Sequence, residues 1–264
     1  MPNQLLLTDD DIELLGRQKI LALSNNCGKT ETGLVAFRWE MGVRCAFLPA
    51  IGIAEIVLRN AMDKEICSWW RLKGYEGSWT DDFLPDAASA LRPFVHLAEW
   101  KKRTGRNISR KDGSITHDDL IAHTSFGTWK NMIGNPSGIP REAPPEKSRY
   151  ISWEALRRRD ARCALLWKDV TSGAFPHIPS KSKRGGLSPR AYIGARITRI
   201  ASLRNRVCHW DNLAKANLEM RRKDIYELVD AMSPSVCQYT IALYDERIRS
   251  AISSKPQWLD SGLK

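Results

Sequence analysis

Hydrophobic residues recur at helical spacing along most of the chain, and the clearest example is segment 188–213. It opens with Ser188 and Pro189, which suit an N-cap and a first helical turn. Its apolar face is formed by Ile193, Ile197, Ile200, Leu203 and Val207. Arg204 falls near the middle of that face at 100° per residue, and Asn205 and His209 lie on its flank. A guanidinium on a core-facing stripe needs a partner or a ligand, so this group is the first candidate for function.

The same periodicity predicts helices elsewhere. A capped, acid-started helix is expected from Thr8 to about Asn25, and a long one from Glu31 to about Trp70, which Pro49 should kink or restart. Further helices are expected over 86–103, 117–133, 151–168, 220–232 and 234–252, with loops rich in proline and glycine at 135–148 and 171–186.

Strand signals are weak throughout, because no stretch alternates apolar and polar residues for long. We therefore predict an all-α helical bundle with inserted loops and an extra helical elaboration. Residues 1–264 are expected to form a single domain, with core helices over about 31–73 and 188–252 and the elaboration over about 75–187.

The charge balance adds a class of partner. A hydrophobic content of 42% and a charged content of 27% are ordinary, but a net charge of +11 favours nucleic acid or an acidic membrane surface. Basic side chains gather in RRRDAR and KSKR, and the candidates for binding RNA phosphate are Arg157, Arg158, Arg162, Lys183 and Arg184. For any one of these groups the alternative is a solvated surface.

Nothing in the sequence indicates a membrane-spanning segment or a cofactor. The longest apolar run, Cys45 to Leu58, contains Pro49 and Glu55 and is expected to be too short to cross a bilayer. The six cysteines lack CxxC spacing, which favours reduced thiols in a cytoplasmic protein. The histidines do not cluster in sequence with cysteine or acidic residues, so no metal and no other cofactor is predicted.

Arg204 and His209 suit the cleavage of RNA without a metal. A histidine can take the proton from a ribose 2′-hydroxyl and later donate one to the leaving 5′-oxygen. An arginine can neutralise the charge that builds up on the phosphorane oxygens. The alternative is structural: His209 caps the helix and Arg204 makes a buried ion pair.

Several ordered segments carry a family resemblance. LRNRVCHWDN (203–212) resembles the signature of the Abi-like (abortive infection) proteins of the HEPN superfamily, in which one helix carries Arg, usually Asn, and then His. FRWE (37–40), AEIVLRNAMDKEI (54–66), SFGTW (125–129) and Phe175-Pro176 resemble further segments of that family, in the same order. Where the family frequently has His-His-Glu-Pro, this chain has HWDN from His209 to Asn212, so any role of a second histidine is in doubt.

The resemblance implies a HEPN fold that dimerises and a metal-independent ribonuclease that leaves a cyclic phosphate, often as a toxin or phage-defence effector. Arg204 and His209 match the catalytic pair, and Asn205 matches the polar residue after the arginine. Glu55 borders an apolar face, and a salt bridge to Arg204 would satisfy both charges; the alternative is a solvated helix flank. Arg59 and Asn60 belong to the same matching segment, and Arg59 could contact RNA or a partner protomer.

We therefore predict a cytoplasmic, homodimeric endoribonuclease with RNA as substrate, no cofactor, and restraint by an antitoxin or inhibitor partner. The alternative is a non-catalytic HEPN-type module that binds RNA or protein and keeps the Arg/His pair for structure. A sealed pair inside one protomer would favour the module, and His209 open to a shared cleft would favour the enzyme. A DNA-binding helical protein is a third alternative, which no helix-turn-helix signature supports.

Overall fold

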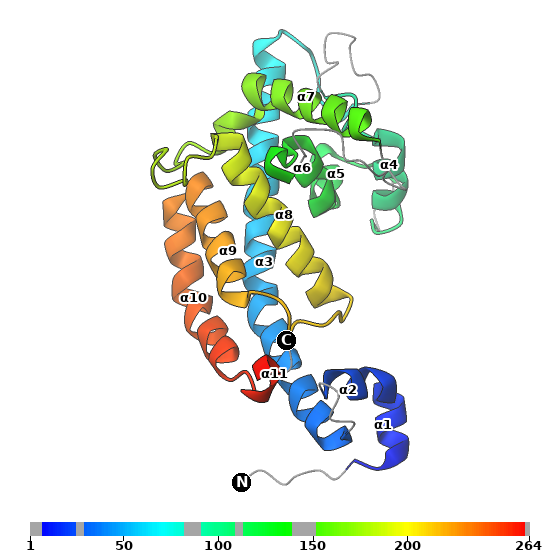
Figure 1. The fold of residues 1–264 in the computed structure, drawn as a ribbon. Helices are drawn as coiled ribbons and strands as arrows, with labels where there is room; N and C mark the ends of the chain where they lie inside the picture. Colours follow the sequence, from blue (N-terminus) through cyan, green and yellow to red (C-terminus); the bar gives the residue numbers. More distant parts are fainter. Residues whose placement is uncertain (1–6, 25–28, 82–90, 109–112, 139–151, 262–264) are drawn as a thin grey trace.

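The fold is built around one long helix, α3 (Thr30–Leu72), which runs unbroken through the molecule (Figure 1). The computed structural model describes residues 7–24, 29–81, 91–108, 113–138 and 152–261. Apolar residues at three- and four-residue spacing give α3 a continuous buried stripe that includes Val43, Phe47, Ile51, Ala54, Leu58, Met62 and Ile66. The other elements pack against this stripe.

The remaining helices follow the expected order. They are α1 (Asp9–Leu15), α2 (Arg17–Leu23), α4 (Leu97–Gly105), α5 (His117–Ala122), α6 (Phe126–Ile133), α7 (Trp153–Asp169), α8 (Pro189–Cys208), α9 (Leu218–Met232), α10 (Pro234–Ser253) and α11 (Trp258–Ser261). Two short 3-10 turns, η2 (Pro136–Gly138) and η3 (Thr171–Ala174), join them. No strand occurs among the described residues, so the all-α prediction is confirmed.

Helices α9 and α10 run beside α3 on one side, and α8 crosses in front of it, as Figure 1 shows. The hairpin of α1 and α2 packs on the N-terminal part of α3, while α6, α7 and η3 gather near its C-terminal half. One hydrophobic cluster runs through all these parts, from Leu23 to Leu259, and includes the predicted core helices and the elaboration. Phe126 and Trp129 of the SFGTW segment are buried in it.

Arginines of α8 fix this helix to its neighbours. The guanidinium of Arg199 donates to the buried carboxylate of Asp224 on α9, with Nε 2.7 Å from Oδ2. Arg196 pairs with Glu227 one turn further along α9, and Arg190 pairs with Asp160 of α7 at 2.8 Å. Asp224 is 2% exposed and also has Arg221 at 3.4 Å, so removing Arg199 would leave this buried carboxylate with only its longer ion pair.

Several helix boundaries differ from the prediction. The expected first helix is interrupted at Gly16, where φ is +89°, a value that glycine adopts without steric cost. The expected helix 117–133 is two helices, α5 and α6, separated by a short turn at 123–125. Residues 86–90 of one expected helix and 139–148 of one expected loop lie outside the described residues.

Pro49 does not interrupt or restart α3, which corrects that part of the prediction and a second one. Both Pro49 and Cys45, whose carbonyl loses its helical donor, lie on the exposed side of the helix, where water can reach that carbonyl. Since the helix continues to Leu72, the argument that its apolar run is too short to cross a bilayer was wrong: α3 is long and apolar enough by length and composition. In this fold 44% of its most apolar window is buried against other helices.

Candidate active site at the end of α8

The C-terminal end of α8 closes in a tight, unusual turn. His209 is the C-cap, and its backbone N–H donates to the carbonyl of Asn205 at 2.8 Å. Trp210 follows with φ at +60°, and Asp211 N–H donates back to Arg206 O at 3.0 Å. This is a Schellman-type ending, in which glycine is the usual left-handed residue. A tryptophan in that conformation is strained and persists only where the surroundings hold it.

A buried ion pair on α3 supplies much of that hold. Arg44 and Glu40 are 5% and 1% exposed, and the Arg44 Nη2 lies 2.9 Å from a Glu40 carboxylate oxygen. Arg44 also donates to three backbone carbonyls at the end of α8, those of Arg206 (2.5 Å), Val207 (3.2 Å) and Asp211 (2.6 Å). The other Glu40 oxygen accepts the backbone N–H of Leu213 at 2.5 Å. The pair therefore satisfies backbone groups that the helix end leaves open, and fixes the turn that carries His209.

Lys19 of α2 holds the same turn from the other side. Its ammonium donates to the carbonyl of Trp210 and lies 5.8 Å from the centroid of the Trp210 ring. The Arg44 guanidinium lies 5.3 Å from that centroid, so the ring contacts two cations. Burial, and then the nearby charge of Arg44, lowers the pKa of Lys19.

The three predicted catalytic residues lie at the C-terminal end of α8, with Asn205 and His209 four residues apart and Arg204 directly before Asn205. Asn205 and His209 are exposed, and Arg204 is partly exposed. Arg204 was expected on the buried stripe, but it is only partly buried, and the fully buried arginine at the end of α8 is Arg44 of α3. The signal for Arg44 was present in the sequence: Glu40 and Arg44 are four residues apart on the apolar face of α3.

Arg204 stands apart from the other arginines of α8. Arg190, Arg196 and Arg199 form ion pairs, and Arg206 donates to the carbonyl of Asn212 at 2.8 Å. Within the described part of the chain, no hydrogen bond or ion pair joins Arg204 to another residue, and its guanidinium is not sealed from water. The alternative in which Arg204 makes a buried ion pair does not fit this arrangement. Its charge stays available for a ligand.

The expected support from residues 55–60 is not found. Glu55 is partly exposed, and the described residues contain no ion pair between it and Arg204, so that prediction was wrong. Arg59 donates from Nη1 to the carbonyl of Ala122 at 2.8 Å and thereby holds the end of α5, while its contact with RNA or a partner protomer stays a prediction. Asn60 is exposed.

The predicted RNA-binding residues divide into two groups. Arg157, Arg158 and Arg162 are exposed on α7, whereas the Arg184 guanidinium donates to carbonyls of its own loop and is partly buried; Lys183, beside it, is exposed. A cavity of about 310 Å³ is lined by Arg162 and Arg159 together with Pro93, Phe94, His96, Thr128 and Asn131. Two arginines of α7 therefore line one side of a hollow that an anion could enter.

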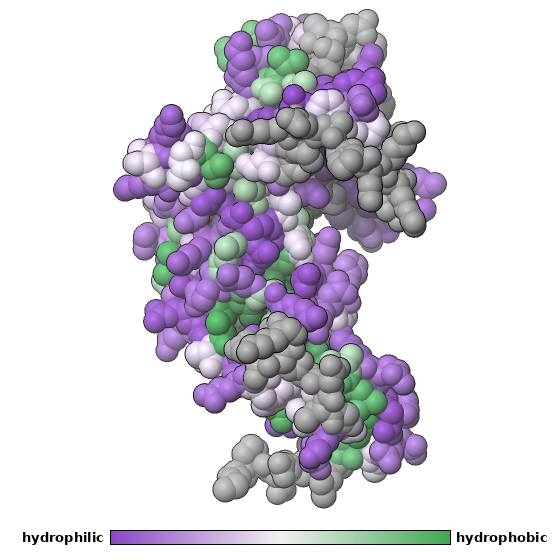
Figure 2. All heavy atoms as spheres, viewed as in Figure 1, coloured by the Kyte–Doolittle hydropathy of each residue, from purple (hydrophilic) through white to green (hydrophobic). Residues whose placement is uncertain are grey.

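A polar stripe connects this region with the end of α8. Thr198 lines a second cavity of about 240 Å³ beside Arg159 and Asp160, and Ser202, Asn205 and His209 follow it at helical spacing. Thr198 is partly exposed and the other three are exposed. Thr198 and His209 are eleven positions apart, which corresponds to about 16 Å at 1.5 Å per residue. Figure 2 shows the molecule hollowed on the side toward which α8 runs.

A second candidate site lies further along α3. Asp63, Cys67 and His117 bring a carboxylate, a thiol and an imidazole within 4.8 Å of one another. Asp63 and Cys67 are four residues apart on one helix, but His117 is 50 residues later, so inspection of the sequence gave no spacing that joins them.

No protein-family model matches this chain, and neither the curated proteins nor the solved structures include a match. The assignment of function therefore depends on the residues and geometry described above.

Proposed function

We propose that the protein is an endoribonuclease that cleaves RNA without a metal, through Arg204, Asn205 and His209. His209 transfers the proton of the ribose 2′-hydroxyl, Arg204 neutralises charge on the phosphorane, and Asn205 orients His209 or a phosphate oxygen. The observation that carries the proposal is the disposition of Arg204. It is the arginine of α8 left without a protein partner among the described residues, and it comes five residues before an exposed histidine on a turn held by buried charges.

The rigid turn suits such a role. Proton transfer requires the imidazole within hydrogen-bond reach of the hydroxyl, so the backbone that carries it must not move. Arg44, Glu40 and Lys19 all bond to backbone atoms of this turn rather than to the catalytic side chains. The side chain of His209 is left free to meet a substrate, and the resemblance to HEPN proteins names the same residues.

A second copy of the chain would complete the site. A single histidine can accept and donate protons only in turn, whereas two histidines can remove the 2′-hydroxyl proton and protonate the leaving 5′-oxygen in the same step. Apolar side chains of Leu48 and Ile56 are about half exposed on α3, with Gly52 between them at four-residue spacing. A Cβ at Gly52 would meet no atom within 4 Å. This stripe is the surface on which we expect the homodimer to form.

The basic side chains of α7 supply the affinity for RNA. Arg157, Arg158 and Arg162 are exposed, and contacts from such residues to phosphates depend on salt and not on base sequence. A toxin of this kind needs restraint, and we expect an antitoxin or inhibitor protein to cover the end of α8. The cytoplasm remains the predicted compartment.

The test is cleavage of a mixed RNA substrate in EDTA by the wild-type protein, His209→Ala and Arg204→Ala. Matched controls are His177→Ala and Arg247→Ala, which remove an exposed histidine and an exposed arginine elsewhere on the surface. Both site variants should lose activity by about 100-fold or more, and both controls should retain it.

Cleavage that persists in both site variants would place the chemistry elsewhere. RNA binding without cleavage by all five folded, dimeric proteins would favour the non-catalytic HEPN-type module.

A further inference from the structure

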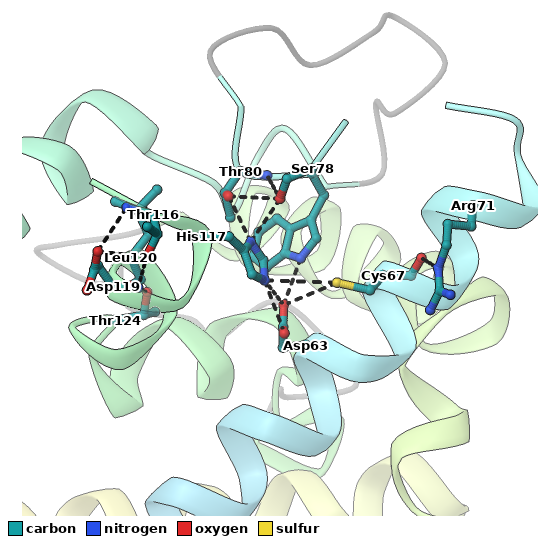
Figure 3. A network of polar contacts seen from close by, with 11 residues as sticks. Asp63, Cys67, Arg71, Ser78, Thr80, Thr116, His117, Asp119, Leu120 and Thr124 are labelled. Carbon is teal, nitrogen blue, oxygen red and sulfur yellow. Dashed lines mark hydrogen bonds and ion pairs between the residues drawn. The ribbon is translucent and has the colours of Figure 1, made fainter. Parts of the chain in front are cut away.

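The second candidate site is a network of polar side chains around His117 (Figure 3). It joins α3, the segment 78–80 and the first residue of α5, three parts of the chain that are distant in sequence. His117 Nε2 lies 3.1 Å from Asp63 Oδ1, Cys67 Sγ lies 3.7 Å from the same oxygen, and the sulfur is 4.0 Å from Nε2. Three different ligand atoms thus face one point.

We propose that Asp63, Cys67 and His117 form a binding site for one transition-metal ion of the zinc class. A mixed set of carboxylate oxygen, thiolate and imidazole nitrogen suits a borderline-soft ion such as Zn²⁺ and does not suit Mg²⁺ or Ca²⁺. The proposal does not depend on the ribonuclease. Asp63 lies nineteen residues beyond Arg44 on α3, about 28 Å away at 1.5 Å per residue.

The distances fit zinc coordination. Tetrahedral zinc with bonds of about 2.0 Å to nitrogen and oxygen and about 2.3 Å to sulfur separates its ligand atoms by roughly 3.3 to 3.5 Å. The observed separations of 3.1, 3.7 and 4.0 Å differ from these by about half an ångström at most, within reach of a small rotation of the Cys67 side chain. Three protein ligands leave a fourth position for water or a substrate.

The residues around the ligands are arranged as in metal sites. When a histidine binds a metal through one ring nitrogen, the other usually carries a hydrogen that donates to a fixed acceptor. His117 Nδ1 lies 2.8 Å from both Ser78 Oγ and Thr80 Oγ1, and Thr80 is 2% exposed. The indole N–H of buried Trp79 donates to Asp63 Oδ1 at 2.8 Å. Two of the three ligands are therefore oriented by a second set of hydrogen bonds.

The local charge also favours a cation. Asp63, Asp81 and Asp118 all act on His117, while Arg71 is the cation that acts on Cys67. This is an acidic neighbourhood in a protein whose net charge is +11. An ion pair between Asp63 and His117 does not require a thiol beside it, whereas a metal ion would bind the Cys67 thiolate as its third ligand.

Metal binding here must compete with protons. The hydrogen bond to Asp63 raises the pKa of His117, and burial, followed by the charge of Asp63, raises the pKa of Cys67 to about 11. Both groups must lose a proton to become ligands, so the affinity should rise with pH and binding should release protons.

The experiment is titration of the full-length, EDTA-treated and desalted protein with ZnCl₂ by calorimetry and with CoCl₂ by absorbance. We expect one ion per chain, a thiolate-to-cobalt charge-transfer band, and tighter binding at pH 8 than at pH 6. Cys67→Ser and Asp63→Asn should weaken Zn²⁺ binding at least about 100-fold and remove the band or change it. Cys45→Ser and Cys208→Ser, which remove exposed thiols outside the cluster, should leave the binding unchanged.

Two results would overturn the proposal: no stoichiometric Zn²⁺ binding by the wild-type protein at micromolar concentration, or equal binding by Cys67→Ser. Circular dichroism of each variant shows whether it folds, and the two substitutions are close in size to the residues they replace. A purely structural ion pair would survive Cys67→Ser with no response to metal in either protein.

Discussion

His209 and His117 are both held in place from α3, but in opposite ways. At the His209 end, the buried carboxylate of Glu40 pairs with Arg44 and accepts the backbone N–H of Leu213. The His209 side chain is exposed to solvent. At the His117 end, Asp63 pairs directly with the imidazole, whose other nitrogen meets two hydroxyls. The first arrangement leaves a histidine free to exchange protons with a substrate. The second fixes the orientation of the ring, as an ion pair or a metal ligand requires.

The largest expected effect is the loss of stability when the buried Glu40–Arg44 pair beneath the end of α8 is broken. Glu40→Ala leaves the Arg44 charge buried without its partner, so we expect a loss of about 3 to 5 kcal/mol in the free energy of unfolding. Chemical denaturation measures it, with the exposed Glu246→Ala as a control that should change stability by no more than about 0.5 kcal/mol. A loss below 1 kcal/mol for Glu40→Ala would show that the pair does not hold the end of α8.

Substitution of His209 should affect RNA cleavage and not stability, whereas substitution of His117 should affect stability and not cleavage. His209→Ala should reduce RNA cleavage by about 10²- to 10⁴-fold and change stability by no more than about 0.5 kcal/mol, because the side chain is exposed. His117→Ala should lower the melting temperature and leave the cleavage rate of the folded protein near that of wild type. Activity assays and thermal unfolding of both variants measure this. The comparison fails if His117→Ala abolishes cleavage in a folded protein.

The pH dependence of stability should identify the Asp63–His117 pair. Since the pKa of His117 is raised in the folded state, the folded protein binds this proton more tightly than the unfolded chain does. The stabilisation by His117 relative to His117→Gln should therefore be fully present below the ordinary pKa of about 6.5 and be lost as pH rises through the raised value.

Denaturation in EDTA at several pH values measures that difference. With saturating Zn²⁺ the sign should reverse, because metal binding strengthens as the ligands lose protons. A difference that is independent of pH in both conditions would contradict the account of this site.

The smallest effect concerns Trp210. Because its φ is +60°, Trp210→Gly should be more stable than Trp210→Ala by about 1 kcal/mol, although both lose the contacts of the ring with Arg44 and Lys19. Chemical denaturation of the two variants measures this difference. Equal stability would mean that the left-handed turn relaxes when the ring is removed.

The sequence predicts most helices well because their apolar faces are long and regular. Helices α7, α8, α9 and α10 begin and end close to their predicted bounds, since each has a serine, asparagine or proline start signal. Pro49 misled the prediction for α3, because the packing of a 43-residue helix outweighs one lost hydrogen bond on its exposed side. Gly16 had the opposite effect: this single residue, with a positive φ, ends α1 although the apolar pattern continues through it.

The two candidate sites differ in how far they could be predicted. Arg204, Asn205 and His209 lie within six residues of one helix end, so the sequence alone placed them together. The sequence did not show that Arg44 is the buried arginine beneath the end of α8. Helical spacing predicts which residues share a face of a helix, but not which other elements pack against that face. Asp63, Cys67 and His117 meet only through the packing of α5 and the segment 78–80 on α3, which no local pattern encodes.

The most direct measurement is the end chemistry of a defined RNA oligonucleotide cleaved in EDTA, beside the same oligonucleotide with 2′-deoxy sugars. Attack by the 2′-hydroxyl, with His209 moving the proton, predicts 2′,3′-cyclic phosphate and 5′-hydroxyl ends and no cleavage of the 2′-deoxy strand. Products with 5′-phosphate ends, or cleavage of the 2′-deoxy strand, would contradict the account, because water or another nucleophile would then attack the phosphate.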